Sequence, residues 1–100
     1  MNRLICDAVS SRRLLHFGYN RIAPVVEPHA HGFNENRVEV MRGYQVHGGS
    51  QSGEDIGWKF FMANRMRDIR LGSVFTRHRT GQEDASRQMI VIHCSVGDKA

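Results

Sequence analysis

Arginine and aromatic side chains alternate in one segment of this sequence. Arg42 and Tyr44 stand two residues apart, and Gln45 follows. Side chains two apart on a β-strand point to the same face, so a guanidinium and an aromatic ring would lie together there. A guanidinium binds phosphate through its planar fork, and a ring stacks on a base. The pattern predicts a surface for an anionic ligand such as single-stranded nucleic acid or a nucleotide.

The positive charge of the chain is concentrated in one window. The 100 residues hold 14 basic and 10 acidic side chains, which gives a net charge of +4. The window from Arg65 to Arg79 contains five arginines and only Asp68 as an acid, so it accounts for the whole net charge. A surface for an anionic partner is one interpretation of this window, and side chains that simply face water are the other.

Two histidines have the spacing of metal ligands. His29 and His31 flank one residue, and zinc would need at least one more ligand, for which the candidates are Cys94, His16 and His93. The alternative is that these imidazoles make structural hydrogen bonds. We predict no metal ion and no cofactor, and a small metal-dependent enzyme stays as an open alternative.

No pattern of catalytic residues stands out. Neither Cys6 nor Cys94 has an adjacent basic and acidic residue of the kind that activates a thiolate. The glycines and serines of residues 48–53 suit a backbone nest for phosphate, but neither a Lys-Ser or Lys-Thr pair nor a helix follows them. The chain is therefore predicted to bind a ligand and not to be an enzyme.

Length and composition predict a single cytoplasmic domain over residues 1–100. The composition is 40% hydrophobic and 24% charged, as in ordinary globular domains. No apolar run approaches the ~18 residues that cross a bilayer, and Asp7 interrupts the stretch where a signal peptide is apolar. Two cysteines give no framework of disulfides, so Cys6 and Cys94 are expected to be small core residues, and no membrane partner is expected.

The periodicity of apolar residues defines the elements that must position these side chains. A helical stripe of Leu4, Ile5, Ala8 and Val9 predicts a helix over about residues 2–13. Apolar alternation then predicts strands at 14–19, 22–27, 37–46, 58–62, 69–75 and 89–96, with loops at 29–36, 47–55 and 80–87. Because of Pro24 and Pro28, the second strand should lie at an edge or carry a bulge, and it should end at Pro28.

One helix followed by five to six short strands predicts a mainly β fold. We expect the N-terminal α-helix at one side of a small, strongly curved antiparallel barrel over about residues 14–96. A parallel sheet would need helices between its strands, which the short spacing excludes. A small open barrel leaves strand edges unpaired. A second interpretation is therefore a structural or interaction domain, acting as a homo-oligomer or as the partner of a larger regulator.

Five collinear pieces of the sequence resemble the WYL domain family. They are Leu4-Ile5-x-x-Ala8-Val9, Leu15-His16-Phe17-x-Tyr19, Arg21 with Val26-Glu27-Pro28-His29, Arg42-Gly43-Tyr44-Gln45, and Trp58-Lys59-Phe60-Phe61 with Asn64-Arg65-Met66. The Trp-Tyr-Leu tripeptide that names the family reads Val38-Glu39-Val40 here. The chain looks like a compact, stand-alone relative, with the resemblance spanning about residues 4–75.

This resemblance implies a fold and a set of binding residues. WYL domains adopt an Sm-like barrel with an accompanying helix, usually inside bacterial transcription regulators, and the family is implied to bind nucleic acid or nucleotide-type effectors. Tyr19, Lys59 and Arg65 match its polar and basic elements. Together with the strand residues named above, the predicted ligand site consists of Tyr19, Arg42, Tyr44, Gln45, Lys59 and Arg65. The alternative is that both tyrosines are ordinary half-buried strand residues.

Overall fold

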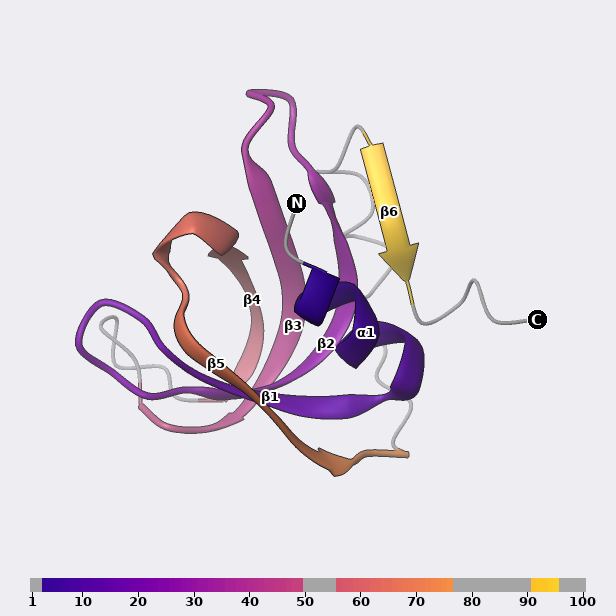
Figure 1. The fold of residues 1–100 in the computed structure, drawn as a ribbon. Helices are drawn as coiled ribbons and strands as arrows, with labels where there is room; N and C mark the ends of the chain where they lie inside the picture. Colours follow the sequence, from indigo (N-terminus) through magenta and orange to yellow (C-terminus); the bar gives the residue numbers. More distant parts are fainter. Residues whose placement is uncertain (1–2, 50–55, 77–90, 96–100) are drawn as a thin grey trace.

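The computed structural model describes residues 3–49 and 56–76, and the backbone of residues 91–95. Helix α1 (Arg3–Ser11) comes first and strands follow (Figure 1). The strands are β1 (Arg13–Gly18), β2 (Val25–Phe33), β3 (Glu39–His47), β4 (Gly57–Met62), β5 (Arg67–Val74) and β6 (Val91–Ser95), with a 3-10 turn η1 (Ala63–Arg65) between β4 and β5. The predicted mainly β class with one N-terminal helix is confirmed. The loop predicted at 80–87 lies outside the described residues, as does most of the one at 47–55.

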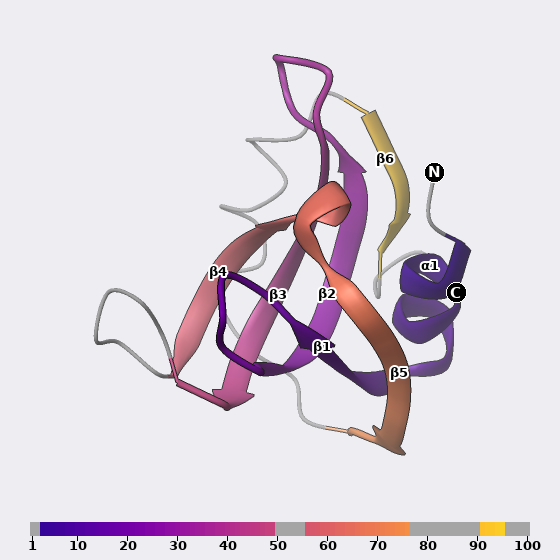
Figure 2. The same ribbon diagram turned by 60° about the vertical axis from the view of Figure 1, so that its left-hand side comes forward.

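All strand pairs are antiparallel and belong to one bent sheet (Figures 1 and 2). The order is β4-β3-β2-β1-β5, and β6 pairs with β2 outside this path. Strands β4 and β5 end the order and do not pair with each other, so within the described ranges the sheet is not closed. The turn η1 leads the chain directly from one of these edges to the other.

Helix α1 covers one face of the sheet with the apolar stripe seen in the sequence. Ile5, Ala8 and Val9 are fully buried, and Ile5 and Ala8 belong to the core that includes Leu15 of β1 and Met41 of β3. The helix ends after Ser11 because Arg12 adopts a left-handed conformation (φ 56°), which turns the chain into β1. The helix is part of the core and not an appendage.

Strand β2 corrects one expectation and confirms another. It does not end at Pro28, since it continues to Phe33 through residues predicted to form a loop. Of the two predicted alternatives, an edge strand or a bulged strand, it is the bulged one, and it lies between β1 and β3. The predicted bulge is present, as the pairing with β3 shifts register between Pro28 and Ala30. On its other edge β2 pairs with β1 at 25–26 and with β6 at 30–33. Pro28 lies in the gap between them, where a missing N–H is tolerated.

The expectation that both cysteines are small core thiols is wrong for Cys6. This residue is disulfide-bonded and only partly buried in the structure. The pairing of β6 with β2 brings the last strand beside α1 and places the backbone of Cys94 opposite His31. Such a long-range approach of strand and helix leaves no trace in the spacing of two cysteines along the sequence.

Strands β2 and β3 pack closely at Gly43. A Cβ at this position would lie 2.3 Å from Cγ1 of Val26 and 2.9 Å from the carbonyl oxygen of Glu27. Only glycine fits such a contact, since real Cβ atoms do not approach this closely. The close packing of these two strands therefore depends on the absence of a side chain.

We expect Gly43→Ala to destabilise the protein by about 1–3 kcal/mol, because the added methyl group must displace β2. Gly18→Ala is the matched control, since its Cβ would meet nothing closer than 3.8 Å. Urea unfolding of both variants followed by circular dichroism measures the difference. Equal midpoints for the two variants would contradict this account of the β2–β3 contact.

Candidate anion-binding site

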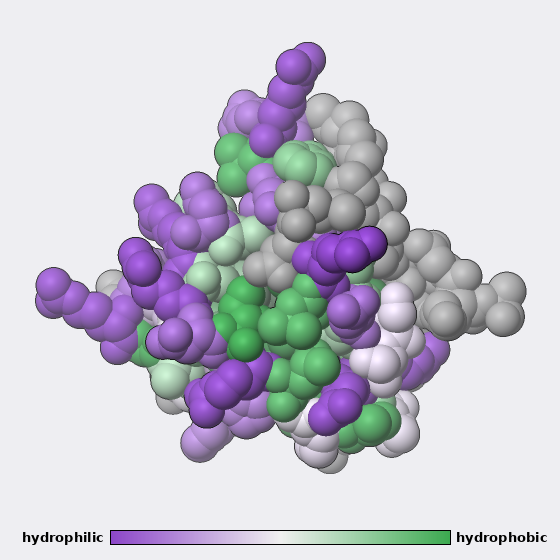
Figure 3. Space-filling model, in the orientation of Figure 1, coloured by the Kyte–Doolittle hydropathy of each residue, from purple (hydrophilic) through white to green (hydrophobic). Residues whose placement is uncertain are grey.

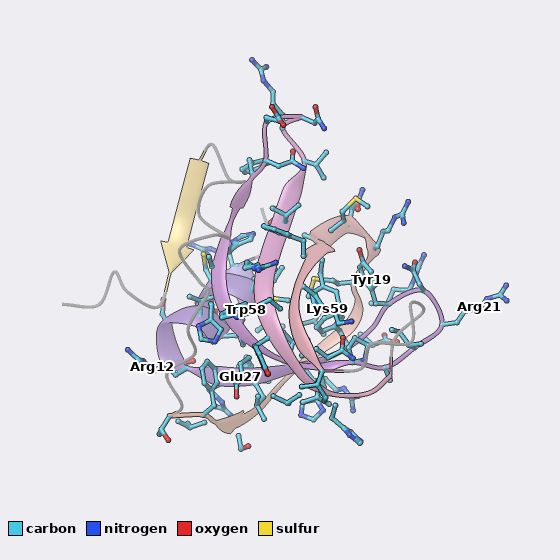
Figure 4. All side chains as sticks on the ribbon, turned by 180° about the vertical axis from the view of Figure 1, so that it is seen from behind. Arg12, Tyr19, Arg21, Glu27, Trp58 and Lys59 are labelled. Carbon is cyan, nitrogen blue, oxygen red and sulfur yellow. The ribbon has the colours of Figure 1, made fainter. Side chains whose placement is uncertain are left out.

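A pocket lies where the β1–β2 hairpin meets the start of β5. Its volume is about 540 Å³, and it is lined by residues 18–22 of the hairpin together with Asn64, Arg65, Arg67 and Asp68. Strongly hydrophilic side chains gather around the tip of this hairpin (Figure 3). Arg21 extends outward from the tip (Figure 4). Two chain segments far apart in the sequence thus share one hollow.

The hairpin wall of the pocket is a two-residue turn with an unusual backbone. Tyr19 and Ile22 exchange backbone hydrogen bonds of 2.9 and 3.0 Å, and the two residues between them, Asn20 and Arg21, have φ values of 51° and 69°. Such a turn requires positive φ at both central positions, where glycine is preferred. An arginine in this conformation costs about 1 kcal/mol or more. Strain of this kind concentrates at functional sites.

Three arginines line the pocket. Arg21, Arg65 and Arg67 are exposed, and within the described part of the chain none of them forms an ion pair. Asp68 is the one acid among the lining residues, and it too has a left-handed backbone, with φ 52°. Uncompensated cations that surround a hollow create a positive potential inside it. The arrangement can hold an anion between several guanidinium groups.

A second hollow extends the basic surface along β5. It has a volume of about 220 Å³, shares Gly18 and Asp68 with the first pocket, and includes Arg70 and His16 in its wall. Arg70 is exposed and has no ion-pair partner among the residues the structure describes. The two hollows are therefore adjacent, and together they are lined by four arginines, which we call the basic track. Arg77 and Arg79, the remaining arginines of the basic window, lie outside the described residues.

Tyr19 and Arg65 are the predicted site residues that the structure brings together in this pocket. The ring of Tyr19 also belongs to the core, because it packs edge-on against Phe17 and Phe61 at centroid distances of 6.2 and 5.1 Å. Its hydroxyl oxygen accepts a 3.0 Å hydrogen bond from the backbone N–H of Met62. Tyr19 is thus a fixed wall of the pocket, and its ring is already engaged by other rings.

Arg42 and Tyr44 share one face of β3, as predicted, but that face is not the one that holds the pocket. The guanidinium carbon of Arg42 lies 5.1 Å from the ring centroid of Trp58 and 4.7 Å from that of Phe60. The rings of Tyr44 and Trp58 meet edge to face at 5.5 Å. Phe61, which contacts Tyr19, alternates with Trp58 and Phe60 along β4. The predicted site is therefore divided between the two faces of the sheet.

Lys59 and Gln45 occupy neither the pocket nor the Trp58 face. Trp58 and Lys59 point away from each other (Figure 4), and Lys59 is not among the pocket residues. Gln45 is fully buried, and its amide nitrogen donates hydrogen bonds to the carbonyl oxygens of His47 and Gly49. In this structure Gln45 holds the chain as it leaves β3.

The bulge in β2 separates the two histidines with metal-ligand spacing. The ring of His29 packs against Trp58 at 4.9 Å and Phe75 at 5.5 Å, whereas Nδ1 of His31 lies 3.1 Å from Sγ of Cys6 on α1. Two residues apart on a regular strand they would share a face, and the extra residue at the bulge reverses this. Within the described ranges, no group of three or more His, Cys, Asp or Glu is arranged to hold a metal ion.

The pocket also includes Arg21, Arg67 and Asn64, which the predicted ligand site did not contain. Arg21 was recognised as part of a turn, and Arg67 as part of the basic window. Their meeting depends on the pairing of β1 with β5, in which Gly18 lies opposite Arg67. The sequence feature that indicated this pocket was the short turn predicted between Tyr19 and Ile22, because it fixes the direction of the hairpin.

Comparison with protein-family models, with curated proteins and with solved structures gives no match for this chain. In the described part of the chain, no helix is long and apolar enough to cross a membrane.

We expect Tyr19→Phe to destabilise the pocket wall locally and to lower the free energy of unfolding of the whole protein slightly. The variant keeps the ring contacts but removes the acceptor of the Met62 N–H, which costs about 1 kcal/mol. Hydrogen exchange followed by NMR should show the Met62 amide losing protection while the amides of α1 keep theirs. An unchanged Met62 amide would contradict the hydrogen bond to Tyr19.

Proposed function

We propose that this chain is a non-enzymatic module that binds a phosphate-bearing ligand, single-stranded nucleic acid or a nucleotide, in the pocket of Arg21, Arg65 and Arg67. The observation that carries this proposal is that three arginines line one hollow and form no ion pair within the described residues. Guanidinium groups favour phosphate because their planar forks donate two parallel hydrogen bonds. A ligand phosphate would supply the missing counter-charge.

The basic track favours a chain of phosphates over a single one. Arg70 in the second hollow lies beyond Asp68 and Gly18, so a ligand that reaches it from Arg65 must be extended. A single strand follows such a track with its backbone and leaves its bases free to contact neighbouring surfaces. We therefore put single-stranded nucleic acid ahead of a free nucleotide.

The resemblance to WYL domains supports the same function. We propose that the bent sheet is an Sm-like barrel of a compact, stand-alone WYL relative, with a role linked to transcription regulation. One helix ahead of an antiparallel sheet is consistent with this fold, and η1 joins the two strands, β4 and β5, whose edges would have to meet for closure. Arg42 and Tyr44 would then lie outside the phosphate track, available to bases only at the sheet's other face.

The salt dependence of binding tests the arginine pocket. Fluorescence anisotropy with a labelled single-stranded oligonucleotide should give a log–log slope of about −2 for three phosphate contacts, and Arg65→Ala or Arg67→Ala should reduce its magnitude by about 0.7. Arg3→Ala is the control, because Arg3 is an exposed arginine of α1 that does not line the pocket. An equal loss in all three variants would contradict a localised site.

Arg21→Gly should act in opposite directions on stability and on binding. Glycine adopts positive φ without strain, so we expect unfolding to become about 1 kcal/mol less favourable. The same change removes one phosphate contact, so the affinity for the oligonucleotide, measured by anisotropy in low salt, should fall. Thermal unfolding and oligonucleotide titration of one preparation measure both effects. A variant that gains stability and binds as tightly as the parent would remove Arg21 from the proposed site.

Exposed apolar residues on β5 favour a second candidate function, that of an interaction domain. Leu71 and Val74 are 36% and 63% exposed, and β5 is the end strand of the described sheet order. Edges with apolar side chains are surfaces on which other strands pair. On this alternative the chain forms a homodimer through β5.

Light scattering after size-exclusion chromatography decides on the interaction function. If β5 is the interface, the protein elutes as a dimer and Leu71→Glu converts it to a monomer, because two charges would face each other across the interface. The exposed Ser73→Glu is the control for added charge on the same strand. A parent protein that stays monomeric at high concentration would exclude this second function.

A further inference from the structure

A cysteine, a histidine and a glutamate from three elements form a line beneath α1. Sγ of Cys6 lies 3.1 Å from Nδ1 of His31, and Nε2 of His31 lies 2.6 Å from Oε2 of Glu39. His31 is fully buried, the side chain of Glu39 is 21% exposed, and Cys6 is partly buried. None of the three lines the arginine pocket, so they form a separate cluster.

The pairing of β2 explains why these groups meet. The bulge after Pro28 turns His31 toward α1. The register of β2 with β3 pairs His31 with Met41 and Phe33 with Glu39, so Glu39 is a diagonal neighbour of His31. On the other edge of β2, the backbone of Cys94 lies opposite His31. Cys6 is disulfide-bonded, and Cys94 is the one other cysteine in the sequence.

One ring nitrogen of His31 faces a sulfur atom and the other faces a carboxylate. The carboxylate of Glu39 accepts a hydrogen bond from Nε2–H. When Cys6 is released as a thiolate, its sulfur can accept a hydrogen bond from a protonated Nδ1, and the ring is then an imidazolium held between two anions. The geometry therefore suits a thiolate at Cys6.

The other charged groups near Cys6 and His31 in the sequence are either exposed or lie on the opposite face of the sheet. On α1 the neighbours of Cys6 are Arg3 and Asp7, and both are exposed. On β2 the second histidine, His29, lies 3.7 Å from Glu27 and packs against the aromatic residues of the opposite face. The side chains of β6 are outside the described residues. Among the described side chains, His31 contacts Cys6 through Nδ1.

We propose that Cys6 is a thiol–disulfide exchange site whose substrate is a low-molecular-weight thiol. In the first step, the thiolate of the substrate attacks the other sulfur of the disulfide, a mixed disulfide forms, and Cys6 leaves as a thiolate. The Nδ1–H of His31 stabilises this thiolate and can transfer its proton to it. Glu39 is a positioning residue, because it holds the ring through Nε2 and does not touch sulfur.

A second substrate thiolate completes the reaction. It attacks the substrate sulfur of the mixed disulfide and releases the oxidised small disulfide together with the second protein thiolate. Two electrons pass from two substrate thiols to the protein disulfide. Because the imidazolium favours the thiolate product, the protein disulfide should be more oxidising than one without such a neighbour.

Equilibration with mixtures of reduced and oxidised dithiothreitol at neutral pH tests the proposal on the full chain. His31→Gln should shift the equilibrium constant about tenfold toward the disulfide, which corresponds to ~30 mV, and Glu39→Gln should shift it in the same direction. Glu27→Gln is the matched control, since it removes the carboxylate beside the other histidine of β2. Equal potentials for the parent, His31→Gln and Glu39→Gln would overturn the proposal.

A second measurement needs no change at His31. In a Cys94→Ser variant Cys6 is the one remaining thiol, and its rate of alkylation by iodoacetamide at neutral pH can be compared between the folded protein and the same protein in urea. An activated thiolate reacts faster in the folded state although it is partly buried, whereas an ordinary thiol reacts more slowly. Slower alkylation in the folded state, or a parent protein whose mass shows no disulfide, would overturn the proposal.

Discussion

The bulge in β2 is the local constraint on which the rest of the structure depends. Strand β2 pairs with β3 along one edge and with β1 and β6 in turn along the other, so its register decides the position of every other strand. The extra residue after Pro28 reverses the alternation of side chains within this one strand. His29 therefore joins the aromatic face of Trp58, while His31 enters the space beneath α1.

The two polar centres of the molecule differ in how their charges are compensated. Around the pocket, Arg21, Arg65 and Arg67 stay exposed and without ion-pair partners in the described chain, and two lining residues beside them hold strained backbones. Beneath α1, His31 is fully buried and both ring nitrogens have partners. Exposed arginines can bind an anion from solvent. The buried His31, with partners at both ring nitrogens, can act only on the atoms that it contacts, such as the sulfur of Cys6.

Much of the fold follows from local patterns in the sequence. The stripe of Ile5, Ala8 and Val9 predicted α1, and period-two alternation predicted β3 and β4 to within a few residues, because a buried face imposes its own repeat on the sequence. The error at β2 has a physical cause as well. Proline usually ends a strand, and only the gap between β1 and β6 permits Pro28 inside one.

The sequence by itself determined the mainly β class, the N-terminal helix, the surplus of arginine in one window and the shared face of Arg42 and Tyr44. All of these depend on residues close together along the chain. Only the tertiary structure decided that Tyr19 and Arg65 meet Arg21 while Arg42 stays on the other face, and that Cys6 meets His31. These contacts depend on strand register and on one bulge, which are long-range pairings that a single sequence does not record.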